Sequence, residues 1–234
     1  MTRRALPLLA ALLWLTGCVV ETSGPVHYEH SSFDRGQVET LRLNLVMGAG
    51  KLRIGSGTEK LLRADFGYNV PAWKPVIDFQ NNNGQASMTI RQPETHHVNV
   101  GHAEYTWDLA LNRDVPLDLS LHFGAGDAKL DLDGIPLRGV RVDMGVGKVE
   151  MDLRGMPKQD YDVSINGGVG QATVRLPDDV GIVADAHGGI GEINASGLHK
   201  DAGGRYVNEA YGRSKVTIHV TVNGGIGEIR LIAD

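Results

Sequence analysis

The sequence predicts an all-β protein whose larger part is a β-solenoid, and three observations support this fold. A Gly-x-Gly core occurs six times. Apolar and polar residues alternate on both sides of every core, as is typical of β-strands. Four consecutive cores are centred on residues 125, 146, 169 and 190, so they are 21, 23 and 21 residues apart, within the range of solenoid repeats. The six cores are Gly48–Gly50, Gly124–Gly126, Gly145–Gly147, Gly168–Gly170, Gly189–Gly191 and Gly225–Gly227.

Each Gly-x-Gly core is expected to form a corner between two strands. Counted from the central residue, the apolar positions lie at even offsets before the core and at odd offsets after it. An unbroken strand would turn the second apolar set to the opposite face of the sheet, so the chain must bend at the glycines. Glycine suits this bend because it tolerates positive φ and has no Cβ. In the third copy the apolar residues are Val140, Val142 and Met144, then Val149 and Met151.

The first 17 residues are predicted to be a signal peptide. Two arginines near the start precede an apolar run of eleven residues, 5–15, which is too short to span a bilayer as a helix. Removing residues 1–17 leaves 21 basic and 28 acidic residues, and therefore a formal charge of −7. This acidic balance argues against a nucleic acid partner.

The apolar run ends in the sequence Leu-Thr-Gly-Cys at residues 15–18, which resembles the bacterial lipobox. The resemblance implies cleavage before Cys18 and acylation of its sulfur and its new amino group, which together anchor a protein stably to a membrane. Val19 follows the cysteine in place of an inner-membrane retention signal, so the outer membrane is favoured if the cell has two membranes. The alternative is a soluble secreted protein. Residues 18–38 are polar and without periodicity, and they are expected to form the lipidated tether.

Residues 39–116 are predicted to form an N-terminal antiparallel β domain. It contains the first repeat at 39–56, followed by a long interval without further copies. Residues 57–118 hold six of the 13 aromatic residues, and apolar alternation continues through them. Asn81–Gly84 is a hairpin turn signal. The sequence thus indicates an antiparallel meander with an aromatic core that caps one end of the solenoid.

Residues 117–234 are predicted to form the β-solenoid domain, with coils of about 21 residues. The inward residue two positions before each core's centre shrinks from Phe123 and Met144 to Gly167 and Gly188, so the core should taper. An insertion at 197–215 precedes the last copy. Within it lie four partner-binding candidates of residue types common at interfaces, and the alternative is a loop folded over the last coil. The candidates are Arg205, Tyr206, Tyr211 and Arg213.

The sequence predicts no catalytic residue, cofactor or metal site. The glycine cores lack the third glycine and the following helix of a dinucleotide fingerprint. His96, His97 and His102 cluster, but solvated histidines explain them more simply than a metal does. One enzymatic alternative remains open, in which paired carboxylates on adjacent coils hydrolyse a carbohydrate. Its acidic residues are Asp131, Asp133, Asp143, Glu150 and Asp152.

Several segments resemble known families. The sequences at 107–112, 115–119, 124–126 and 130–132 resemble the bacterial toast-rack family. The C-terminal part, from Tyr206 to Leu231, is similar to the β-solenoid of cell-wall-active-antibiotic response proteins and of proposed β-helical adhesins. The resemblance implies a β-rich fold over residues 39–234, whereas it says little about function.

Together the sequence features predict an exported lipoprotein, anchored to the membrane through Cys18, that acts as a structural or binding module of the bacterial cell envelope. Its partner would be an envelope protein or a glycan. The alternatives are the carbohydrate-active enzyme described above and a protein that senses envelope stress or mediates adhesion through a protein partner.

Overall fold

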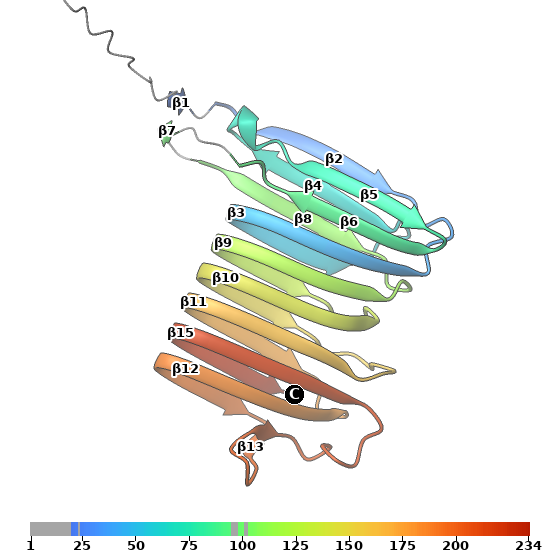
Figure 1. Ribbon diagram of the computed structural model, residues 1–234, viewed down its shortest axis with the longest axis vertical. Helices are drawn as coiled ribbons and strands as arrows, with labels where there is room; N and C mark the ends of the chain where they lie inside the picture. The colour runs from blue at the N-terminus through green and yellow to red at the C-terminus, as the bar shows by residue number, and fades with distance from the viewer. Residues whose placement is uncertain (1–19, 23, 95–97, 101–102) are drawn as a thin grey trace, which may run out of the picture.

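The computed structural model describes residues 20–22, 24–94, 98–100 and 103–234, and most of them lie in β-strands (Figure 1). The only helical element in these ranges is a short 3-10 helix, η1 (Pro71–Trp73). No helix in the described part of the chain has the length and apolar character needed to cross a membrane. The prediction of an all-β fold is confirmed.

Each Gly-x-Gly repeat is one long strand bent at its glycines into two legs. The bent strands pair in parallel, and the pairing is in register from leg to corner to leg. The first and second legs therefore form two facing layers of a single open sheet, with apolar side chains between them. The six bent strands are β3 (Thr40–Ser56), β9 (Leu117–Asp131), β10 (Leu137–Asp152), β11 (Tyr161–Leu176), β12 (Gly181–Ser196) and β15 (Thr217–Ala233).

The corners require glycine for two reasons. The last glycine of every core has a positive φ, for example 137° at Gly147 and 146° at Gly170. Successive corners also stack so closely that a Cβ on Gly147 would lie 1.9 Å from the carbonyl oxygen of Gly126. The corner predicted from the change of parity is confirmed by this geometry.

The strands do not stack in chain order, because the last strand is inserted between two earlier ones. The order along the column is β3-β9-β10-β11-β15-β12. Strand β15 pairs with β11 on one side and with β12 on the other. The sequence pattern did not predict this order. After β12 the chain crosses the outer edge of that strand and then returns to fill the gap beside β11.

At the N-terminal end each layer of the column continues into its own antiparallel strands. The first leg of β3 pairs with β6 (Gln85–Arg91), which pairs with β5 (Val76–Asn82). The second leg pairs with β8 (Tyr105–Leu111), followed by β4 (Leu62–Tyr68) and β2 (His27–Phe33). The predicted antiparallel pairing is confirmed between β5 and β6, between β8 and β4 and between β4 and β2, whereas β6 and β8 join β3 in parallel. The structure adds that these strands are divided between two layers. The expectation that all of residues 18–38 form a tether is wrong, because β2 lies within them and pairs with β4.

Two local features complete this end of the molecule. The turn between β5 and β6 has positive φ at Asn83 (51°) and Gly84 (85°), as the hairpin signal predicted. Strand β1 (Val20–Thr22) pairs in parallel with β7 (Val98–Val100), separately from the large sheet.

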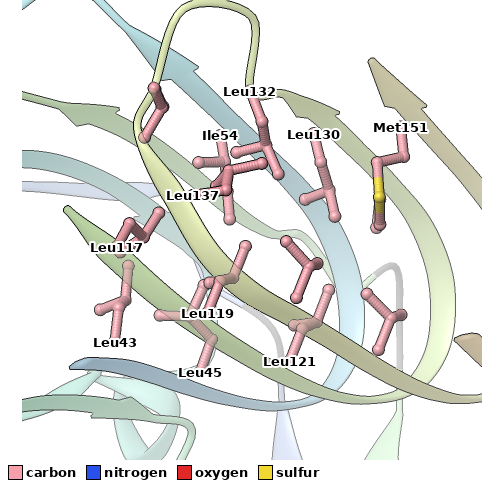
Figure 2. Close-up of a cluster of buried hydrophobic side chains, with 14 of the residues drawn as sticks. Leu43, Leu45, Ile54, Leu117, Leu119, Leu121, Leu130, Leu132, Leu137 and Met151 are labelled. Carbon is pink, nitrogen blue, oxygen red and sulfur yellow. The ribbon is translucent and has the colours of Figure 1, made fainter. Parts of the chain in front are cut away.

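The core of the column is built from layers of aliphatic side chains. Figure 2 shows side chains of the first legs, such as Leu43 and Leu119, beside those of the second legs, such as Ile54 and Leu130. All four of these residues are buried. Towards β12 the inward positions hold Gly167, Gly188 and Gly224, and a cavity of about 30 Å³ lies among them.

This cavity leads to a test with two adjacent glycines. A Cβ on Gly167 would have no other heavy atom within 4 Å, whereas one on Gly168 would lie 2.5 Å from the carbonyl oxygen of Gly145. We expect Gly167→Ala to raise the free energy of unfolding by about 0.5–1 kcal/mol. Gly168→Ala should lower it by about 2 kcal/mol, because the backbone of the stacked corner cannot move aside. Urea denaturation of both variants measures the difference, and equal midpoints would contradict the packing of the corners.

Candidate functional site

Four carboxylates of the enzymatic alternative lie on the outer face of β9 and β10, and Asp133 lies in the turn between these strands. Three of the five have the following polar partners. Asp152 accepts hydrogen bonds from Nη2 of Arg154 at 2.7 Å and from its Nε at 3.0 Å. Glu150 forms an ion pair with Lys148. Asp143 accepts a hydrogen bond from the amide of Asn166 at 2.8 Å.

The electrostatics of these groups do not suit acid catalysis. The hydrogen bonds from Arg154 lower the pKa of Asp152, and the hydrogen bond from Lys148 lowers the pKa of Glu150. A carboxylic acid that protonates a glycosidic oxygen needs a raised pKa instead. In the described ranges, moreover, no three His, Cys, Asp or Glu side chains are grouped so that they could hold a metal ion. These carboxylates are therefore typical of a solvated protein surface with ion pairs.

The lowered pKa of Asp152 leads to a prediction about acid stability. A carboxylate whose pKa is lower in the folded state stabilises the fold above its unfolded pKa of about 3.9, and this contribution is lost as the pH falls through the folded value. We expect Asp152→Asn to cost about 1 kcal/mol at pH 7 and to lose less stability than the wild type on acidification below about pH 4. Denaturation curves between pH 2 and 7 measure both effects. Asp131→Asn, at the exposed neighbour on β9, is the control that should follow the wild type.

The insertion at 197–215 lies over the outer edge of β12, at the end of the column. Strand β14 (Tyr206–Val207) pairs antiparallel with Val183 and Ala184 of β12, and β13 (His199–Lys200) pairs with β14. Asn208 joins the insertion to the start of β12. It is buried, accepts a hydrogen bond from the backbone N–H of Ile182 at 2.9 Å and donates one to the carbonyl of Val180 at 2.7 Å.

The four partner-binding candidates lie in the insertion at 197–215, here called the cap, and each contacts another side chain of that segment. Arg205 donates two hydrogen bonds to a carboxylate oxygen of Asp201, at 2.7 and 2.9 Å, and its guanidinium lies 5.8 Å from the ring centroid of Tyr211. The Nζ of Lys200 lies over the ring of Tyr206, 5.0 Å from its centroid. The Nη2 of Arg213 lies 2.9 Å from the carboxylate of Glu209, and both side chains are exposed. The structure thus brings Arg205 and Tyr211 together, and binding by any of the four stays a prediction.

A second candidate surface was missed in the sequence. The turns between coils, on the side of the column away from the glycine corners, enclose a cleft of about 490 Å³. Prolines and buried aliphatic residues line it, together with Tyr161, whose hydroxyl has a pKa raised by burial. A signal for it is present in the sequence, because prolines recur every 20 or 21 residues between the coils, at Pro116, Pro136, Pro157 and Pro177. The prolines and basic residues of the cleft are Pro116, Pro136, Pro157, Arg113, Arg138, Arg154 and Lys158.

Some predicted residues fall outside the described part of the chain. They are the signal peptide, the lipidation residue Cys18 and the three histidines His96, His97 and His102.

Comparison with known proteins identifies relatives of this fold. The family described as the N-terminal domain of toast_rack, DUF2154, matches residues 22–175. A solved structure of a protein named for a proposed role in cell adhesion, from Clostridium sporogenes, is 35% identical, with a TM-score of 0.87 over 90% of this chain and 100% of that one. A proposed adhesin from Bacteroides fragilis is 10% identical, with a TM-score of only 0.32 over 90% of this chain and 99% of that one. No curated protein matches the sequence.

The family match covers most of the N-terminal part and the first coils of the column, and the Clostridium structure extends the likeness to nearly the whole chain. The chain therefore belongs to the toast-rack family.

Proposed function

We propose that the protein is an exported lipoprotein, held at a membrane of the bacterial cell envelope by acylated Cys18, and that it acts there as a binding module without catalytic activity. The observation that carries this proposal is the position of the two ends of the column. Strand β1, which begins two residues after Cys18, lies at one end, and the cap formed by β13 and β14 lies at the other (Figure 1).

The column between these ends is long enough to hold the cap away from a membrane. Eight strand-to-strand steps lead from β2 to β12. At about 4.8 Å a step, they span about 40 Å. The continuous ladder makes this spacer rigid, so the cap would be presented to the space beyond the membrane.

The chemistry of the cap suits a protein or glycan partner. Arg205 and Tyr211 form a rigid pair, since the guanidinium is held by Asp201 and lies over the ring. Such arginine and tyrosine side chains are enriched at interfaces. The relative from Clostridium, whose name refers to cell adhesion, supports the same class of function. We therefore propose that an envelope protein or a glycan binds at the cap.

The anchor and the binding surface are tested separately. Radiolabelled palmitate should enter the wild type and not Cys18→Ser, and equal labelling would eliminate the anchor. A photo-crosslinking amino acid at Arg213 in intact cells should give a specific adduct. The same amino acid at Thr221, an exposed site on the flank of β15, is the control. Equal adducts at both sites, or none at Arg213, would contradict binding at the cap.

A further inference from the structure

The glycine corners carry a row of exposed apolar side chains that the fold itself does not require. Val146, Val169, Ile226 and Ile190 occupy the central position of four stacked corners and are 53%, 45%, 50% and 71% exposed. They are in register on neighbouring strands, so they form one continuous stripe, here called the corner row. They are four of the eight large hydrophobic residues that the described part of the chain exposes. A contiguous stripe of this kind marks an interaction surface more often than scattered apolar residues do.

The same position is filled differently at the other end of the column. There the corners of β3 and β9 hold Ala49 and Ala125, also exposed and in register with Val146. The corner therefore accepts a small residue without loss of its backbone geometry. Branched side chains in four adjacent corners leave apolar area in water that burial would stabilise by about 25 cal/mol per Å².

The residues on either side of the corners are complementary to one another in five of the six coils, and in the sixth, β3, they are Val46 and Lys51. One flank lies three residues before the central position and the other lies two residues after it. In three coils the two flanking residues are a histidine with a carboxylate or a carboxylate with a lysine. These pairs are His122 and Asp127, Asp143 and Lys148, and His187 and Glu192.

The coils of β11 and β15 continue this complementarity with amides. Asn166 and Gln171 flank the corner of β11, and Asn223 and Glu228 flank the corner of β15. An amide can donate to an amide oxygen or to a carboxylate, so neither coil brings two carboxylates together.

We propose that the corner row is the contact surface for a second copy of this chain, packed side by side and parallel about a twofold axis along the row. This operation places each coil against the same coil of the second copy and each flank against the opposite flank. Asp143 then faces Lys148 of the second copy, and Lys148 faces its Asp143. An antiparallel arrangement over all six corners is less favourable, because it places Asp127 opposite Glu228.

The expected strength of the contact follows from its size. Together with the two alanine corners of β9 and β3, the corner row extends over six corners, and five steps between them give a strip about 24 Å long and one corner wide. This is smaller than a standard protein interface, so association should be weak in dilute solution. It would become effective where many copies are held close together.

Disulfide trapping tests the proposal on the full chain carrying Cys18→Ser, which removes the only native cysteine. Val146→Cys and Ile190→Cys should each form a homodimer at least tenfold faster than Thr221→Cys, an exposed control outside the row. Equal rates would overturn the proposal. Val146→Cys and Ile190→Cys lie three strand steps, or about 14 Å, apart. A disulfide that forms only when the two variants are mixed would therefore overturn the parallel arrangement.

A charge exchange separates this contact from chance collision and from lipid binding. Lys148→Asp should slow the trapping of Ile190→Cys, and Asp143→Lys in the same chain should restore it. Failure of this rescue would contradict the facing flanks. In a parallel assay with phosphatidylcholine vesicles, Ile190→Glu should leave sedimentation unchanged. Reduced sedimentation, with Val146→Cys trapped only at the control rate, would assign the row to a lipid surface instead. Neither result depends on the anchor or on the cap.

Discussion

Replacement of Gly147 by valine should destabilise the protein by about 3–5 kcal/mol, a large part of the total stability of an ordinary domain. The glycine has a φ of 137°, and any Cβ there would lie 1.9 Å from the carbonyl oxygen of Gly126. The obstacle is the backbone of a stacked strand, which cannot rotate away as a side chain can. Chemical denaturation followed by circular dichroism measures the effect.

The control for this prediction is Gly55→Val, in the second leg of β3. A Cβ at Gly55 would have no other heavy atom within 4 Å, and its φ is not positive. Valine also suits a strand better than glycine. We expect the midpoint of Gly55→Val to stay close to that of the wild type. If Gly147→Val behaved in the same way, the requirement for glycine at the corners would be wrong.

Asn208→Ala should destabilise the protein by about 3 kcal/mol, because two buried backbone groups, the N–H of Ile182 and the carbonyl of Val180, lose this partner. Besides Ile182 and Val180, the side chain bonds the N–H of Tyr211 at 3.1 Å and the carbonyl of Asp178 at 3.2 Å. These bonds join the cap to the start of β12. Loss of stability should therefore appear first as faster hydrogen exchange in β12 and β14.

An exposed asparagine gives the matched control. Asn223 lies on the outer face of β15 and donates one side-chain hydrogen bond, to Asn166 at 3.0 Å. Asn223→Ala should cost less than about 1 kcal/mol, since water replaces the lost partner. Equal losses for the two variants would show that Asn208 does not hold the cap.

Much of the column could be predicted because its signals are local. The offset of Val142 and Met144 from the corner, set against that of Val149, is enough to require a bend. Successive side chains of an unbent strand point to opposite faces of the sheet, so an unbent strand could not bury all three. The turn at Asn83 and Gly84 was predicted for the same reason, since its positive φ values depend on neighbouring residues alone.

The position of β15 could not be predicted, because its apolar pattern fits several neighbouring strands equally well. Val220 and Val222 of β15 match Val163 and Ile165 of β11 and also Ala184 and Ala186 of β12. Any stacking order therefore satisfies the pattern. The path of the insertion decides between them, and that path depends on Asn208 and on bonds across the cap.

The candidate surfaces were less predictable than the fold. The composition of the insertion pointed to Arg205 and Tyr211, but their contact depends on how the insertion turns back on itself. The continuity of the corner row depends on the stacking of Ile226 between Val169 and Ile190, which the chain order conceals. The division of the antiparallel strands between two layers was hidden likewise, since alternation does not indicate which leg of β3 a strand will join.

The central claim is that the bent strands stack in one column with β15 between β11 and β12. Ser164 of β11 is paired in register with Thr221 of β15, which is paired on its other side with Asp185 of β12. Neighbouring strands lie about 4.8 Å apart, within reach of a disulfide, whereas next-but-one strands lie about 9.6 Å apart and out of reach. With Cys18→Ser as background, Ser164→Cys/Thr221→Cys should therefore form an intramolecular disulfide, and Ser164→Cys/Asp185→Cys should not. A disulfide in the second variant and none in the first would contradict the account.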